Sequence, residues 1–306
     1  MSAANQDSLR GFAFAVTAYV LWGFLPIYMK ALAHIPPSEV IAHRVIWSVP
    51  VAGAVLWLTG RTQDLRIALT SPRMLGMAIV TATLISLNWG IYVWSIAAGH
   101  TLDAALGYYI NPLFSIFLGA VLLRERLSPA QIAAIVVAAA AVAVLTWQAG
   151  KLPVAAVALT LTWGGYAFLK KWLPIGPNQG FTLEVLLLLP PALAYVAWLV
   201  ATGQNHMLVG NATDSWLLFG CGLVTAAPLM IYANGAKLLR LSTIGLLQYI
   251  APTMIFLTAV FVFGEEFGPA RMIAFPMIWL SLIIYTASMV QQSRRTRRKV
   301  PVPKVL

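Results

Sequence analysis

Two charged side chains lie inside long apolar segments of this sequence, where they could bind an ion or a charged group of a ligand. Arg44 is six residues into the apolar segment 38–59, and Glu184 is three residues into the segment 181–202. A charge at the depth of a lipid bilayer is costly and is rarely present without a role. Because a guanidinium stays protonated there, Arg44 requires either an acidic partner or an anionic ligand.

The sequence leaves two interpretations of these charges open. Each could form an ion pair that holds helices together, with Asp103 as the expected partner of Arg44 and Lys237 as that of Glu184. Alternatively, the two side chains could bind substrate or a coupling proton. In the first case, removing one partner leaves an uncompensated buried charge, which costs about 3–5 kcal/mol.

Amide and aromatic side chains accompany these charges inside the apolar segments. Amides can join membrane helices through hydrogen bonds of about 0.6 kcal/mol each, or they can line a polar cavity. Several rings are too central for an interfacial belt, and aromatic walls with a few amides suit a flat, amphipathic solute better than an ion. We predict a substrate site formed by Arg44, Glu184, Trp22, Asn88, Tyr92, Tyr109, Asn111, Trp163, Tyr232, Asn234, Gln248 and Tyr249.

Residues for metal binding, disulfide bonds or hydrolysis are few and scattered. The one cysteine, Cys221, cannot form an intrachain disulfide, and the four histidines lack the spacing of a metal site. The nine acidic residues are dispersed instead of clustered as in a catalytic site. No Gly-rich phosphate loop of the kind that drives primary pumps is visible. The sequence therefore predicts no metal, no cofactor and no enzymatic activity.

The elements that must position these side chains are membrane-spanning helices. Of the 306 residues, 60% are hydrophobic and 9% charged, whereas soluble domains carry about 25% charged residues. Continuous apolar runs exclude the alternating pattern of a β-barrel, so we predict an all-α membrane protein with ten transmembrane helices. Segments long enough to cross about 30 Å of hydrocarbon lie at 11–32, 38–59, 74–97, 102–123, 129–147, 152–172, 181–202, 215–238, 243–263 and 269–290.

Basic residues concentrate on one side of these predicted helices. The loops and termini on that side carry sixteen Lys and Arg residues, against three on the other side. The positive-inside rule then places both termini in the cytoplasm of a bacterium, with the chain crossing the inner membrane several times. The net charge of +11 is explained by this distribution, so we expect membrane lipid and not nucleic acid as the partner.

A repeat with an offset of about 140 residues divides the chain. The tetrapeptide 109–112 recurs at 249–252, and Trp22-Gly23 recurs as Trp163-Gly164. We predict five-helix repeats over 10–147 and 152–290, followed by a basic cytoplasmic tail over 291–306. An odd number of helices inverts the second repeat, as in secondary transporters whose substrate site lies near the midplane between the repeats. A duplication retained only for packing is the alternative.

These motifs resemble the EamA domains of the drug/metabolite transporter superfamily and, within it, the RarD branch, which is named for chloramphenicol sensitivity. The resemblance rests on residues 43–48, 106–112, 241–243 and 248–252, and on the pairs Arg124-Glu125 and Gly264-Glu265 at the ends of the fourth helices. We expect these two glutamates to anchor loops. Arg124 and Ala251 stand where the family commonly has glycine. The resemblance implies a ten-helix transporter with a poorly defined substrate.

Together these observations predict a secondary active or facilitative transporter that exports a small amphipathic metabolite or drug-like solute by alternating access. A coupling proton or counter-solute is a possible further partner. A membrane receptor or assembly scaffold without transport is one alternative, and a membrane-embedded enzyme acting on lipid is another. Solute flux in proteoliposomes distinguishes the first alternative from a transporter.

Overall fold

The computed structural model describes residues 8–60, 62–123, 127–149, 152–170, 174–236, 238–239 and 247–299, and its regular elements within these ranges are all helices. The first six are α1 (Leu9–Ala31), α2 (Pro37–Leu58), α3 (Gln63–Thr70), α4 (Pro72–Ala97), α5 (Thr101–Leu123) and α6 (Pro129–Ala149). The others are α7 (Val154–Lys170), α8 (Pro177–Ala201), α9 (His206–Val209), α10 (Ala212–Ala236), α12 (Ile250–Leu257), the π-helical turn η1 (Thr258–Val262) and α13 (Pro269–Lys299).

The all-α prediction is confirmed, and the chain is a multi-pass membrane protein. Among the described residues, seven helices are long and apolar enough to cross a membrane, namely α1, α2, α4, α6, α8, α10 and α13. Two apolar helical stretches are shorter, Val154–Leu169 in α7 and Ile250–Val262 in α12 and η1. The count of ten transmembrane helices therefore stays a prediction.

Local sequence signals explain where several helices begin and end. Proline stands at the first position of five helices, where its missing N–H costs no hydrogen bond, at Pro37, Pro72, Pro129, Pro177 and Pro269. The Ser8 hydroxyl oxygen accepts a hydrogen bond of 2.9 Å from the Gly11 backbone N–H and caps α1. Gly99, with φ 74°, ends α4 in the left-handed region that glycine adopts readily.

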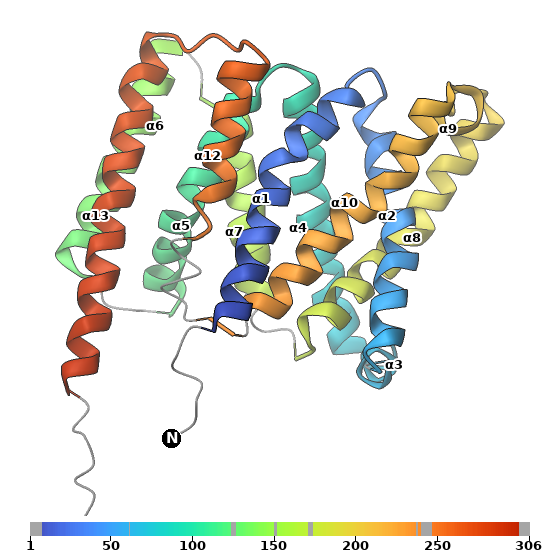
Figure 1. The fold of residues 1–306 in the computed structure, drawn as a ribbon, viewed down its shortest axis with the longest axis horizontal. Helices are drawn as coiled ribbons and strands as arrows, with labels where there is room; N and C mark the ends of the chain where they lie inside the picture. The colour runs from blue at the N-terminus through green and yellow to red at the C-terminus, as the bar shows by residue number, and fades with distance from the viewer. Residues whose placement is uncertain are drawn as a thin grey trace, which may run out of the picture.

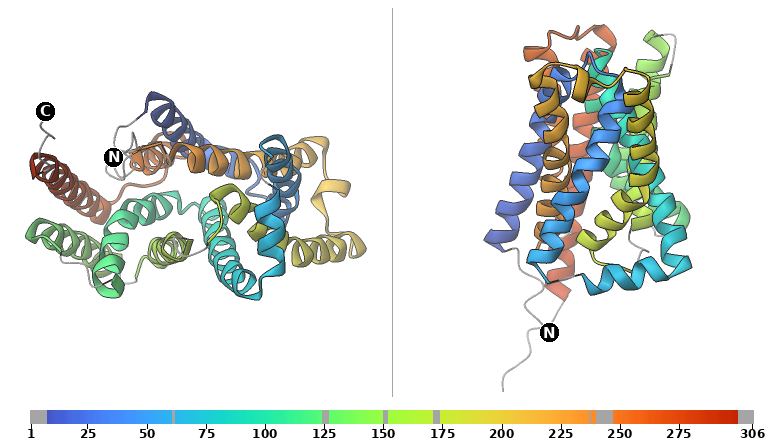
Figure 2. Two further views of the ribbon diagram at one scale, coloured as in Figure 1. Left: turned by 90° about the horizontal axis from the view of Figure 1, so that it is seen from below. Right: turned by 90° about the vertical axis from the view of Figure 1, so that its right-hand side faces the viewer.

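Eight helices form a closed ring of neighbours in the order α12, α1, α10, α2, α8, α4, α7 and α5. Seen from below, they lie in two rows, with α12, α1, α10 and α2 facing α5, α7, α4 and α8 (Figure 2). Helices α6 and α13 pack against each other beside this ring. The start of α1 and the end of α13 lie at the same end of the molecule (Figure 1).

The structure adds a short helix where the sequence predicts only a loop, at 61–72. Helix α3 lies across the ends of the longer helices (Figures 1 and 2). Its Ala68 is buried in a cluster with Leu183 of α8, whereas Ile67 and Leu69 are exposed. An amphipathic segment at this depth is typical of a helix that lies in the membrane interface. Helix α9 likewise interrupts the predicted loop over 203–214.

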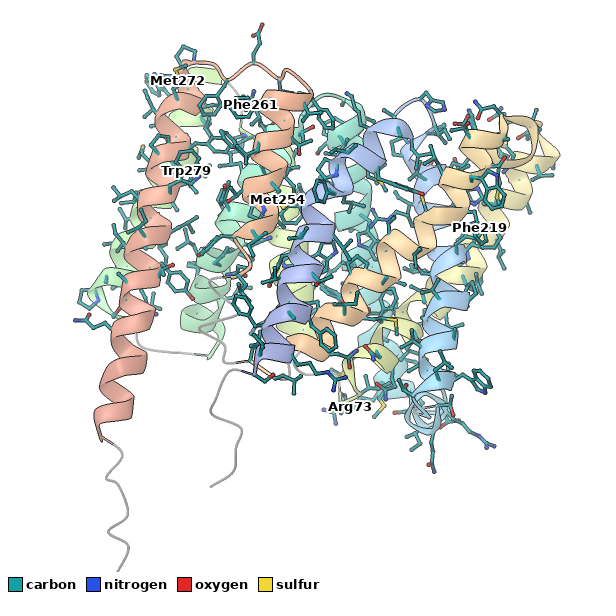
Figure 3. The ribbon with its side chains drawn as sticks, in the orientation of Figure 1. Arg73, Phe219, Met254, Phe261, Met272 and Trp279 are labelled. Atoms are coloured by element: carbon teal, nitrogen blue, oxygen red, sulfur yellow. The ribbon has the colours of Figure 1, made fainter. Side chains whose placement is uncertain are left out.

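Glycine permits close approach at several helix crossings. A Cβ atom at Gly222 of α10 would overlap the backbone carbonyl of Trp47 in α2. A Cβ atom at Gly23 of α1 would overlap the side chain of Met254, which lies on the neighbouring α12 (Figure 3). Membrane helices gain little from the hydrophobic effect and depend on this type of close packing.

We expect Gly222→Ala to lower the melting temperature of the purified protein in detergent. The added methyl group meets backbone, which cannot rotate away, and overpacking of this kind costs about 1–3 kcal/mol. The matched control is Gly53→Ala, because a Cβ there would have nothing within 4 Å. Alanine favours helix over glycine by about 1 kcal/mol, so the control should be unchanged or slightly more stable. Equal melting temperatures for the two variants would contradict this account of the α2–α10 crossing.

Candidate functional site

A cavity of about 130 Å³ lies inside the ring of helices. Its lining combines aromatic rings, three amides, one guanidinium and a few aliphatic side chains from seven helical segments, α1, α2, α4, α5, α7, α10 and the region of α12. The lining residues are Tyr19, Trp22, Leu25, Arg44, Asn88, Trp89, Tyr92, Tyr108, Asn111, Trp163, Thr225, Leu229, Tyr232, Gln248, Ala251, Pro252 and Ile255.

The cavity brings together eight of the twelve residues that the sequence predicts for a substrate site. These eight are Trp22, Arg44, Asn88, Tyr92, Asn111, Trp163, Tyr232 and Gln248. They come from both halves of the chain, five of them from before residue 150 and three from after it. The other four predicted residues, Tyr109, Glu184, Asn234 and Tyr249, lie outside this cavity lining.

Among the described residues Arg44 is the one charged residue in the cavity lining, and it is only 3% exposed. Its Nε donates a hydrogen bond of 2.9 Å to the Thr225 hydroxyl oxygen on α10. Its guanidinium carbon lies 4.9 Å from the centroid of the Trp89 ring on α4. A cation over an indole ring is attracted by the negative face of the ring. These two contacts fix the guanidinium between α4 and α10.

The predicted ion pair between Arg44 and Asp103 is wrong. Asp103 instead accepts a hydrogen bond of 3.2 Å from Arg271 Nη2, and the two side chains are about a quarter exposed. Arg271 reaches Asp103 at the helix ends, where neither charge has to be fully desolvated. Among the described residues, no carboxylate forms an ion pair with Arg44.

Aromatic rings in contact with one another form a continuous part of the cavity wall. Trp22 and Trp163 meet edge to face, with ring centroids 6.4 Å apart. Trp22 also contacts Tyr19 and Tyr232, each at 5.5 Å between centroids. Trp163 also contacts Tyr108, with ring centroids 6.4 Å apart. Edge-to-face pairs of this kind are favourable beyond the area they bury, so the wall is a defined surface.

Asn88 joins three helices at the cavity and is fully buried. Its amide nitrogen donates to the Leu159 carbonyl at 3.2 Å and to the Thr162 hydroxyl at 3.0 Å, both on α7. Its amide oxygen accepts from the Tyr108 hydroxyl of α5 at 3.3 Å. Asn88 therefore joins helices and lines the cavity at once, so the two roles considered for the amides are compatible at this position.

Glu184 lies behind the cavity wall, 1% exposed. Its carboxylate accepts hydrogen bonds from the Thr81 hydroxyl of α4 at 2.7 Å and from the Tyr166 hydroxyl of α7 at 3.1 Å. The Tyr166 ring in turn packs against Trp163, at 5.8 Å between centroids. The expected pair of Glu184 with Lys237 is not tested, because Lys237 lies outside the described residues.

Tyr109 and Tyr249 line a separate, open groove together with Thr253 and Trp279, the last of which lies on α13 (Figure 3). The Tyr109 hydroxyl donates to the Thr253 hydroxyl at 2.8 Å. The four tyrosines of the predicted site are therefore divided between the central cavity, which Tyr92 and Tyr232 line, and this groove. Asn234 is exposed, and its amide donates to the Met230 carbonyl of its own helix at 2.8 Å.

The sequence-based prediction omits several lining residues. Tyr19 and Tyr108 each precede a predicted site residue by three positions, Trp22 and Asn111, and residues three apart share a helix face. That spacing is a signal that could have found them. Thr225 carries no such signal, because threonine is common in apolar helices and its contact with Arg44 depends on how α10 packs against α2.

Carboxylates hold the helix ends on the side of the molecule away from α3. Glu265 accepts hydrogen bonds from the backbone N–H groups of Thr101 at 2.7 Å and Leu102 at 3.0 Å, at the start of α5. The expected loop-anchoring role of Glu265 is confirmed, whereas Glu125 lies outside the described residues. Glu39, fully buried, accepts from the backbone N–H of His206 at 2.8 Å and lies 2.7 Å from its Nδ1.

Comparisons with known proteins agree with these features. Residues 9–147 match the EamA-like transporter family. The chain is 38% identical to an uncharacterized transporter of Vibrio cholerae, covering 97% of this chain and 99% of the relative. It is 35% identical to protein RarD of Escherichia coli K12, covering 96% and 99%. A crystal structure that is 19% identical, with a TM-score of 0.61 over 91% of this chain and 98% of that chain, shares the fold.

We expect cysteines replacing Tyr92 and Tyr232, one at a time and with Cys221 changed to alanine, to react with a water-soluble thiol reagent. Both positions line the central cavity, so water that fills the cavity should reach them. The control is Val93→Cys in the same background, because Val93 neighbours Tyr92 on α4 and is buried, but is not part of the cavity lining. Labelling measured by mass spectrometry that is no faster at positions 92 and 232 than at position 93 would contradict a water-accessible cavity.

Proposed function

The chain belongs to the EamA-like transporter family, and we propose that it moves a small amphipathic solute across the bacterial inner membrane by alternating access. Relatives over nearly the full length are named transporters. The observation that carries the proposal is the central cavity, which combines seven aromatic rings with one buried guanidinium and three amides. Solute sites have this composition, with a mostly apolar lining and a few polar groups that fix orientation.

The proposal includes ten transmembrane helices in two inverted repeats, α1, α2, α4, α5 and α6 followed by α7, α8, α10, α12 with η1, and α13. Exchanging equivalent helices reproduces the main packing pairs: α1 packs on α10 as α7 packs on α4, and α1 packs on α12 as α7 packs on α5. The same exchange also carries the row α12, α1, α10 and α2 onto the row α5, α7, α4 and α8. This agreement supports a pseudo-two-fold axis between the repeats.

Individual contacts in one repeat also recur between the equivalent helices of the other repeat. Gly23 of α1 meets Met254 of α12, and the equivalent Gly164 of α7 meets Phe114 of α5. The equivalent pair Trp22 and Trp163 contact each other directly, as residues beside the axis must. The cavity that these tryptophans line is therefore central to both repeats, and a site in that position can be opened first to one face and then to the other.

We propose that the end of the molecule carrying α3 faces the cytoplasm. The start of α1 and the end of α13 lie at that end (Figure 1). It also carries the basic segments between the helices, including Arg66 in α3 and Arg73 at the start of α4. Cytoplasmic loops with an excess of Lys and Arg are the rule in inner-membrane proteins.

A buried carboxylate near the cavity offers a site for a coupling proton. Glu184 is bound by two hydroxyl donors and is separated from the cavity by Trp163 and Tyr166. Carboxylates at such depth in transporters commonly carry protons.

A receptor or assembly scaffold is the second candidate function, and it differs from a transporter in predicting no solute flux.

The orientation predicts the location of three reporters. A reporter fused after Leu306 and one inserted in the segment 61–72 should both be cytoplasmic, and one in the segment 203–214 should be periplasmic. Alkaline phosphatase and green fluorescent protein report the two compartments in opposite ways. At each site, the fusion to one reporter therefore serves as the control for the fusion to the other. A periplasmic C-terminus would overturn the topology.

The transport proposal predicts efflux from proteoliposomes that contain the purified protein. The vesicles are loaded with four solutes that share a phenyl ring: 3-phenylpropionate, 3-phenylpropionamide, phenylalanine and 2-phenylethylamine. Mass spectrometry measures their release. At least one should leave faster than from protein-free vesicles, and Trp22→Ala should slow it about tenfold, because an aromatic contact contributes about 1.5 kcal/mol.

Trp57→Ala is the matched control, since Trp57 is 76% exposed on the outside of α2 and should leave the rate unchanged. If all four solutes stay inside vesicles that hold folded protein, transport of small amphipathic solutes is wrong. A receptor or scaffold then becomes the better description.

A further inference from the structure

We propose that the central cavity selects organic anions with a flat aromatic body, and that Arg44 binds their carboxylate. The proposal rests on the transport function above and specifies the charge and shape of the substrate. It predicts preference for an aromatic monoanion over the corresponding neutral, zwitterionic or cationic compound.

The first step is the charge balance around Arg44. The guanidinium is 3% exposed and stays protonated, so it requires negative charge nearby. The described carboxylates whose contacts are known all bind other groups: Glu39 binds His206, Asp103 binds Arg271, Glu184 binds Thr81 and Tyr166, Asp214 binds His34, and Glu265 binds the start of α5. Within the described part of the chain, the positive charge at the cavity is thus not balanced by the protein.

The second step is the geometry of the guanidinium. Thr225 accepts from Nε, and Trp89 covers one face of the guanidinium plane. The donors left for a ligand are on the terminal nitrogens, and Nη1 has no hydrogen-bond partner among the described residues although it is buried. A carboxylate binds such a fork through two parallel hydrogen bonds. Arg44 is therefore held in an orientation that suits a carboxylate.

The third step concerns the rest of the ligand. The aromatic part of the lining includes Trp22, Trp163 and Tyr108 in edge-to-face contact, and such rings bind a flat apolar body. A cation is disfavoured because Arg44, the one charged lining residue within the described part of the chain, has the same sign. An additional ammonium group would have to share the Asn88 oxygen with the Tyr108 hydroxyl. The lining therefore fits an aromatic carboxylate without an amino group.

A purely structural role for Arg44 would also explain its contacts with Thr225 and Trp89. The experiment must therefore measure how the dissociation constant depends on the charge of the ligand. The four phenyl compounds named above differ at one group each: the amide removes the charge of 3-phenylpropionate, phenylalanine adds an ammonium, and 2-phenylethylamine replaces the carboxylate by an ammonium. Isothermal titration calorimetry on the full-length protein in detergent measures the four dissociation constants.

We expect the wild-type protein to bind 3-phenylpropionate at least about tenfold more tightly than each of the other three, the ratio that 1.4 kcal/mol produces. Arg44→Gln should bring the acid and the amide to within about threefold of each other, because the charge-assisted hydrogen bonds are lost. Arg44→Lys should keep the preference for the acid at reduced affinity, since lysine retains the charge without the fork. Arg271→Gln removes a charge outside the cavity and should bind as the wild type does.

Three results would overturn the proposal: an amide, zwitterion or amine that binds the wild type as tightly as the acid, an acid preference that persists in Arg44→Gln, or no measurable binding of the acid. If Arg44→Gln does not fold, the wild-type ligand series and Arg44→Lys still decide the question. Equal efflux of the acid and the amine from proteoliposomes would reject anion selection and leave the transport function intact. Acid-selective binding without efflux of any solute would reject transport alone.

Discussion

A permanently charged guanidinium inside an apolar helix bundle is the constraint on which the central cavity depends. Arg44 cannot lose its proton, so the surrounding helices must supply compensating contacts at fixed positions. Thr225 does so from α10 and Trp89 from α4, which ties the packing of both helices against α2 to the location of one charge. The lining around it, as far as the structure describes the chain, carries no other charged residue. The position of Arg44 thus sets the polarity of the site.

The two halves of the chain bury opposite charges through the same type of contact. Arg44 of α2 donates to Thr225 of α10, and Glu184 of α8 accepts from Thr81 of α4. The helix pairs α2–α10 and α8–α4 are equivalent under the proposed exchange of repeats. Under the proposed exchange, one packing arrangement holds a cation in one half and a carboxylate in the other. This difference gives the two halves different electrostatic properties.

The sequence predicts the helical fold and most of the cavity because both depend on local signals. Apolar segments of sufficient length give the helices, prolines give several of their starts, and the repeat relates Trp22 to Trp163. The partner of Arg44 could not be predicted in this way. Asp103 is at a suitable depth, but whether it meets Arg44 or Arg271 depends on how α5 rotates against α13. The same rotation places Tyr108 in the cavity and Tyr109 outside it.

The contact between Glu265 and α5 limits how the cavity can open. Helix α12 continues into the π-helical turn η1, and the backbone N–H of Glu265 bonds to the Ala259 carbonyl at 3.0 Å, so the chain turns towards α5. The Glu265 carboxylate then binds the N–H groups of Thr101 and Leu102, where the helix dipole favours negative charge. Helices α5 and α12 both line the cavity and pack against each other. An opening motion at this end must therefore either break the contact or move α5 and α12 together, and the second course keeps the hydrogen bonds of Glu265.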